Sequence, residues 1–129
     1  MRIEDHKESF NEHKETIFTW AIDTKGIERS QRIIGLHASR AILDLLQIKL
    51  QKENKITSGT MLNHRWFKSL RVKEKLPDFE DKDKIIEDIV ELELLCENLS
   101  YGSKKTSNEI NKTLELFKKL EQKLSDETE

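Results

Sequence analysis

The hydrophobic residues of this chain recur every three or four positions, which is the spacing of amphipathic α-helices. This pattern predicts a first helix from about Ile3 to Thr24, which stops near Gly26, and a second helix from about Ile27 to Glu53. The segment from Asn54 to Gly59 contains several turn-forming residues and is predicted to be a turn. No segment shows the two-residue alternation of a half-buried strand.

A proline divides the second half of the chain. Pro77 ends any helix before it, so residues 60–70 are predicted to form only a short helical or irregular piece. Beyond Pro77, apolar residues with a 3.6-residue period predict a third long helix, which Asp81 or Asp83 can cap. Gly102 is the predicted stop of that helix.

The last predicted helix has an explicit start signal. Thr106, followed three residues later by Glu109, has the spacing of a capping box. Four long helices with a short piece between the second and third predict an all-α fold, an antiparallel four-to-five-helix up-and-down bundle. Because 129 residues is the length of one ordinary domain, residues 1–129 are predicted to form a single domain with a core from about residue 3 to residue 124.

The second predicted helix is expected to be the centre of the bundle. Its pattern is apolar around most of its circumference, whereas a surface helix shows one apolar stripe. Gly35 lies inside this helix, where it lowers helix propensity by about 1 kcal/mol but permits the close approach of another backbone. The helix carries more apolar surface than the neighbours in one small chain easily cover, so we expect a homodimer.

The charges are distributed unevenly along the chain. The formal net charge of -2 argues against nonspecific binding to duplex DNA, which usually requires a strongly basic domain. Arginine suits bidentate contacts with anions better than lysine does. The sequence therefore predicts a local anion site in the middle segment, which holds five arginines: Arg29, Arg32, Arg40, Arg65 and Arg71.

Several classes of protein are disfavoured. The single cysteine, Cys96, cannot form an internal disulfide and lies in an apolar helical pattern, so it is predicted to be a core thiol. No run approaches the roughly 20 apolar residues that cross a bilayer, and the first ten residues lack an apolar signal region. We expect a cytoplasmic protein with no membrane contact. Motifs for metal hydrolysis, P-loop nucleotide hydrolysis and serine hydrolysis are absent, so no metal or cofactor is expected.

Arg40 and Asp44 are spaced four residues apart in the central helix and share one face. They form either a buried ion pair that fixes the register of the bundle or a cleft-lining pair that orients Arg40 toward an anionic ligand. Arg29 lies near the same line along the helix, because eleven residues make about three turns. It either extends an Arg40 site or is solvated near the helix start.

Arg32 and His37 form the pattern R-I-I-G-L-H. The arginine can stabilise charge on a scissile phosphate, and the histidine can act as acid or base near neutral pH. Helical spacing places them roughly 140° apart, so both reach one phosphate only at a helix end or across a dimer interface. The alternative is a satisfied polar pair at the wall of the bundle.

The densest polar and aromatic cluster is the run Asn63 to Lys68. Within it, Trp66 can stack on a base while His64 and Arg65 contact phosphate, as in nucleotide recognition without duplex reading. Alternatively, Trp66 seals the end of the bundle and the polar residues are solvated.

Three stretches of the chain resemble the HEPN superfamily of helical bundles, many of whose members carry an Arg-x4-6-His motif. SRAILDLLQIKL looks like the Ala- and Leu-rich helix of the family, and LNHRWFKSL lies where many members have a brief segment with a histidine. ENLSYGSKKTSNEINKTLELFKKL is similar to the tyrosine-containing end of the next helix and the final amphipathic one. The resemblance covers roughly Ile27 to Leu124.

This resemblance implies nucleotide or RNA association and frequent homodimerisation. In some branches it also implies metal-independent ribonuclease activity at a dimer cleft, or partnership with a nucleotidyltransferase. We therefore expect a HEPN-like nucleotide-binding or RNA-interacting module whose ligand-binding residues are Arg29, Arg40, Asp44, His64, Arg65 and Trp66.

Two alternative functions follow from the same sequence. One is a metal-independent ribonuclease in which Arg32 and His37 are the catalytic residues. The other is a structural protein-interaction module without catalysis. We expect binding rather than catalysis.

Overall fold

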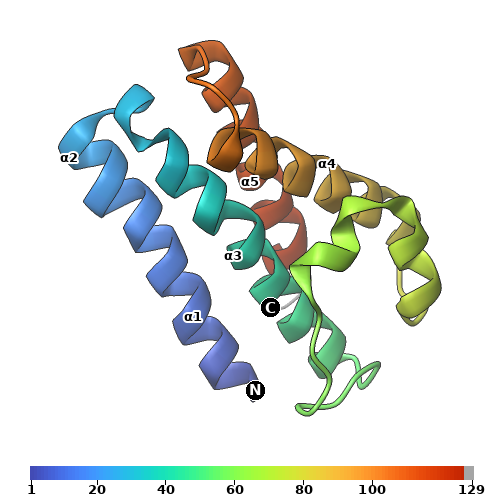
Figure 1. The fold of residues 1–129 in the computed structure, drawn as a ribbon. Coiled ribbons are helices and arrows are strands. Elements are labelled where there is room, and N and C mark those ends of the chain that lie inside the picture. The colour runs from blue at the N-terminus through green and yellow to red at the C-terminus, as the bar shows by residue number, and fades with distance from the viewer. Residues whose placement is uncertain (127–129) are drawn as a thin grey trace.

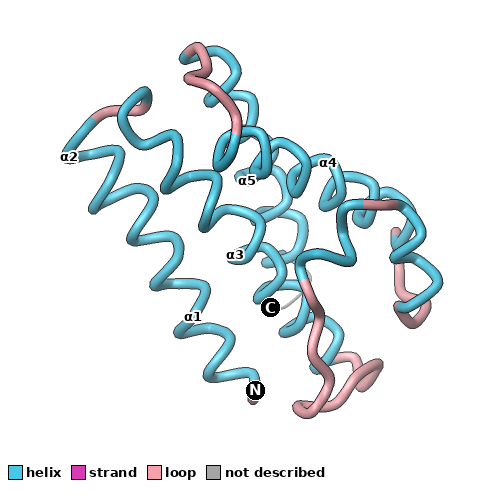
Figure 2. The backbone as a smooth tube through the Cα atoms, in the orientation of Figure 1, coloured by secondary structure: helices cyan, strands magenta, loops and turns pink. Residues whose placement is uncertain are grey.

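In the computed structural model, which describes residues 1–126, the chain forms a bundle of helices, and this range holds no strand (Figures 1 and 2). Each long helix runs back against the one before it (Figure 1). The prediction of an all-α bundle is confirmed. No helix within residues 1–126 combines the length and the apolar character that crossing a membrane would require.

The first helical segment consists of three consecutive pieces. Helix α1 (Ile3–Glu15) continues into a π-helical stretch, η1 (Thr16–Ile22), and then into the single turn α2 (Asp23–Lys25). The predicted stop at Gly26 is confirmed, because this residue has a φ of 84°, a backbone conformation that favours glycine. The π-helical stretch was not predicted, since the apolar spacing there is also compatible with an ordinary α-helix.

Helix α3 (Gln31–Lys52), preceded by the short 3₁₀ turn η2 (Glu28–Ser30), is the centre of the fold. It contacts α1, α4 (Lys82–Tyr101) and α5 (Ser107–Asp126), and all of residues 41–50 are buried. This confirms its predicted central position.

Helices α3 and α4 approach each other closely at Gly35. A Cβ atom at this position would lie 2.8 Å from the carbonyl oxygen of Cys96 and 2.9 Å from the backbone nitrogen of Ser100. Both distances are shorter than van der Waals contact, so only glycine fits without a shift of α4. The close backbone approach expected at Gly35 is therefore confirmed.

Two short 3₁₀ helices, η3 (His64–Lys68) and η4 (Leu70–Lys75), form the piece between α3 and α4. Their first turns are held by side chains: Asn63 Oδ1 accepts a hydrogen bond from the Arg65 N–H at 2.9 Å, and Ser69 Oγ accepts one from the Arg71 N–H at 3.2 Å. Both 3₁₀ helices pack against α4. This arrangement fixes the positions of His64, Arg65 and Lys68.

The helix ends follow the predicted signals in part. The capping box at the start of α5 is confirmed, with the Thr106 N–H donating to Glu109 Oε2 at 3.0 Å and the Glu109 N–H donating to Thr106 Oγ1 at 3.3 Å. Gly102 ends α4, also as predicted. Asp81 precedes α4 but makes no side-chain cap, because its carboxylate instead accepts a hydrogen bond from Lys123 Nζ at 2.8 Å.

Candidate functional site

A cavity of about 370 Å³ lies where α3, α4 and η3 meet. Three cationic side chains and two carboxylates face it, together with a histidine, a tyrosine and small residues. We call it the Arg40 cavity, and its lining residues are Gly35, Leu36, Ser39, Arg40, His64, Arg65, Lys68, Glu93, Glu97, Ser100 and Tyr101.

Two guanidinium groups of the Arg40 cavity have no carboxylate partner within residues 1–126. The Nη2 atom of Arg40 lies 3.5 Å from Nε2 of His64, and the side chain of Arg65 makes no ion pair in that range. Both arginines are exposed. The third cation, Lys68, is paired with Glu97 at 3.1 Å. The cavity therefore presents two free guanidinium groups, which suit an anion such as phosphate.

The predicted pair between Arg40 and Asp44 is wrong. Asp44 instead faces α1, where its carboxylate contacts His6 Nδ1 and accepts a hydrogen bond from Ser9 Oγ, each at 2.7 Å. The short aspartate side chain is buried and takes the nearest donors, whereas the long arginine side chain is exposed and extends to His64. Asp44 does not line the Arg40 cavity.

His37 belongs to the same group as Asp44. Its Nδ1 lies 2.9 Å from Nδ1 of His13, and His13 Nε2 lies 3.8 Å from the Asp44 carboxylate. Burial lowers the pKa of both His13 and His37 below the ordinary value of 6.5, and the Arg40 guanidinium lowers both pKa values further. One ring must donate and the other accept, which suits two neutral imidazoles. We call His6, Ser9, His13, His37 and Asp44 the Asp44 cluster.

The structure does not bring Arg32 and His37 together. Arg32 Nη1 donates hydrogen bonds to the carbonyl oxygens of Leu99, Ser100 and Gly102, at 3.0, 2.9 and 2.7 Å. These carbonyls lie at the C-terminal end of α4, where helix carbonyls lack partners and the helix dipole is negative. Arg32 thus caps α4, and its guanidinium faces carbonyls rather than the His37 ring.

Two other predicted ligand-binding residues lie outside the Arg40 cavity. Arg29 is exposed in η2 and does not line it. Trp66 is half-buried against the core, with Lys75 Nζ 4.9 Å from the centre of its ring. The sealing alternative for Trp66 therefore matches its position, whereas His64 and Arg65 line the same cavity as Arg40.

Sequence reasoning missed Lys68, Glu93 and Tyr101 as lining residues. A signal for Glu93 was present, because positions four residues before it and three after it in the helical pattern are the apolar Ile89 and Cys96. An acid on that face of a helix must point into the bundle. Lys68 and Tyr101 carry no comparable signal, since each looks like an ordinary exposed residue.

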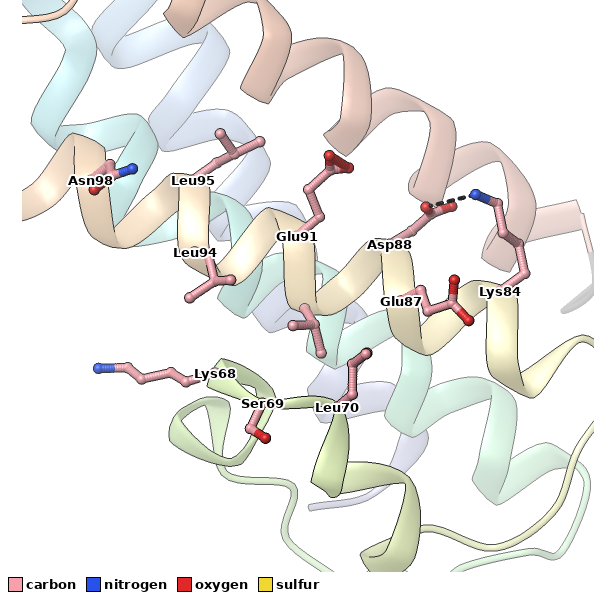
Figure 3. Close-up of a pocket in the computed structure, with 11 residues that line it drawn as sticks. Lys68, Ser69, Leu70, Lys84, Glu87, Asp88, Glu91, Leu94, Leu95 and Asn98 are labelled. Carbon is pink, nitrogen blue, oxygen red and sulfur yellow. Dashed lines mark ion pairs between the residues drawn. The ribbon is translucent and has the colours of Figure 1, made fainter.

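A larger, more open groove of about 640 Å³ lies between α4 and the segment that carries η3 and η4 (Figure 3). Leu70 and Leu94 point toward it, and the Lys84 and Asp88 side chains along α4 are paired at 3.2 Å (Figure 3). The ion pair neutralises part of the charge of the groove, and the two leucines give it apolar surface. It offers no free cation comparable to Arg40 or Arg65.

Two further kinds of reactive group are potential metal ligands and the cysteine thiol. Within residues 1–126, no three or more His, Cys, Asp or Glu side chains are arranged to hold a metal ion. Cys96 is buried, and burial raises the pKa of its thiol to about 12. The thiol therefore stays protonated at neutral pH, which confirms the prediction of a core thiol rather than a nucleophile.

The chain matches no known family model, no curated protein and no solved structure.

Proposed function

We propose that this chain is a HEPN-like nucleotide-binding or RNA-interacting module and that the Arg40 cavity is its anion site. The observation that carries the proposal is that two guanidinium groups, Arg40 and Arg65, line one cavity and that neither has a carboxylate partner in the described part of the chain. Two like charges that face one cavity favour the binding of an anion there. The cavity volume of about 370 Å³ lies within the range of small-ligand pockets.

The test is a thermal-shift measurement with AMP, GMP, CMP and UMP in the presence of EDTA. A nucleotide at about 100 times its Kd stabilises the folded protein by about 2.7 kcal/mol, which raises Tm by several degrees. Arg40→Ala should abolish this rise because it removes one of the two free guanidinium groups.

Arg29→Ala is the matched control. It removes the same charge from an exposed position that does not line the cavity, so the Tm rise should persist. If no nucleotide raises the Tm of the unmodified protein, the proposal is contradicted. A protein-interaction module is then the better explanation of the chain's function. An equal loss in both variants would point to a general charge effect instead of a site.

A further inference from the structure

Glu93 is a buried acid of the Arg40 cavity whose carboxylate is poorly satisfied. The residue is 5% exposed, and its Oε1 atom has no hydrogen-bond partner within the described part of the chain. The other oxygen, Oε2, lies 3.5 Å from Nδ1 of His64. A buried carboxylate without donors is costly to a fold. The Oε1 atom is therefore open to a hydrogen-bond donor from a ligand.

The acidic and cationic side chains lie at different depths of the cavity, and a ligand must match this arrangement. Glu93 is buried, whereas Arg40, Arg65 and Lys68 are exposed, so the acid lies deep and the cations lie at the rim. A simple phosphate would satisfy only the rim. A simple amine or amidine would satisfy only the carboxylate and would be repelled by the arginines. The matching ligand carries adjacent N–H donors at one end and an anion at the other.

We infer that the Arg40 cavity selects guanine among the nucleobases, with the Glu93 carboxylate accepting hydrogen bonds from N1–H and the 2-amino group while Arg40 and Arg65 bind the phosphate. This inference rests on the proposed function and names the ligand class of the same site.

Guanine is favoured because it presents two donors side by side. Adenine and cytosine each place a ring nitrogen acceptor beside the amino group, and uracil places its one N–H between two carbonyl oxygens. An acceptor facing the Glu93 carboxylate is repelled and cannot form the second hydrogen bond. The exposed Leu36 and Tyr101, which also line the cavity, offer apolar surface for the plane of a base.

The first test uses the unmodified chain and isothermal titration calorimetry at pH 7.5 with GMP, IMP and AMP. GMP should bind about tenfold to a hundredfold more tightly than AMP, which is the range expected for a bidentate contact with a base. IMP keeps N1–H but lacks the 2-amino group, so its affinity should fall between the two. This comparison requires no variant to fold.

The second test is Glu93→Gln, which keeps the shape of the side chain but replaces one acceptor oxygen by a donor. The affinity for GMP should fall to that for AMP, and the affinity for AMP should change little. Glu91→Gln is the matched control, because Glu91 is an exposed acid on the same helix outside the Arg40 cavity. The control should keep the full preference for GMP.

The outcomes separate this inference from the proposed function. Equal binding of GMP, IMP and AMP overturns the guanine assignment and leaves nucleotide binding intact, whereas no binding of any nucleotide overturns both. A third comparison uses two single-stranded hexanucleotides, one with guanine and one without. It shows whether guanine is recognised within a strand as well as in a free nucleotide. Where GMP is preferred over AMP, the tighter of the two guanine ligands, GMP or the hexanucleotide, tells whether the base is bound free or within a strand.

Discussion

Asp44 and Glu93 are two buried acids on either side of Arg40, and the fold treats them differently. Asp44 is 8% exposed and has two contacts of 2.7 Å, with His6 and Ser9 of α1. Glu93 is 5% exposed, and one of its oxygens lies 3.5 Å from Nδ1 of His64. The fold thus satisfies the first carboxylate and not the second. A buried carboxylate that accepts hydrogen bonds within the fold is best explained as a contribution to stability. A buried carboxylate that lacks such hydrogen bonds is best explained as a ligand-binding group.

Among the variants that test this difference, Asp44→Asn is expected to change the free energy of unfolding most. The amide cannot accept from both His6 and Ser9 as the carboxylate does, so the free energy of unfolding should fall by about 2 kcal/mol. Urea unfolding followed by circular dichroism measures the change.

Asp88→Asn is the control for this variant. Asp88 is equally buried at 8% exposure, but its partners are the exposed Lys84 and Lys119, which water can solvate when the carboxylate is lost. Its loss of stability should be under about 1 kcal/mol. A loss in Asp44→Asn no larger than in Asp88→Asn would remove the contrast between the two carboxylates.

A smaller effect of the opposite sign is expected for Glu93→Gln in the absence of ligand. Replacing a buried carboxyl group whose Oε1 has no hydrogen-bond partner within residues 1–126 should leave stability unchanged or raise it by about 1 kcal/mol. The same urea titration reports it, and Glu91→Gln should stay within about 0.5 kcal/mol of the unmodified protein. Marked destabilisation of Glu93→Gln would mean that the fold, and not a ligand, depends on this carboxylate.

The smallest effect concerns pH and belongs to the Asp44 cluster. Because the pKa values of His13 and His37 in the folded state lie below 6.5, the unfolded chain binds protons first as the pH falls. Stability that is fully present above pH 6.5 should therefore decline as the pH falls through 6.5 toward the folded pKa values. Urea unfolding between pH 8 and pH 5.5 measures the slope.

The double variant His13→Asn/His37→Asn should flatten this dependence. The range from pH 8 to pH 5.5 lies above the ordinary pKa values of exposed carboxylates. A slope that is unchanged in the double variant would assign the acid sensitivity to other groups.

Most of the fold could be predicted from the sequence, because helix periodicity and end signals are local properties. The stop at Gly26, the capping box of Thr106 and Glu109, and the close approach at Gly35 each follow from one or two residues. The π-helical stretch could not be predicted, since it depends on how α1 packs against its neighbours. The homodimer, the RNA or nucleotide ligand and the nucleotidyltransferase partner stay predictions.

The candidate site could be predicted only in part. Arg40, His64 and Arg65 were expected near one another, and the structure places all three on one cavity. The partners of Asp44 and Arg32 were missed because they lie on α1 and at the end of α4, which no local pattern connects to α3. Spacing along one helix shows which residues share a face, but the neighbouring helices determine which contacts form.

The capping of α4 by Arg32 has a consequence for the cavity. Arg32 and the close approach at Gly35 tie α3 to α4 at the end of the bundle where Leu36 and Tyr101 lie, so the two helical walls of the cavity are fixed to each other. The two helices lose their motion relative to each other when the chain folds. Ligand binding therefore does not have to restrict this motion. A molecule that enters the cavity therefore meets preorganised helices, and the conformational entropy lost on binding is confined to a few long side chains such as Arg40 and Arg65.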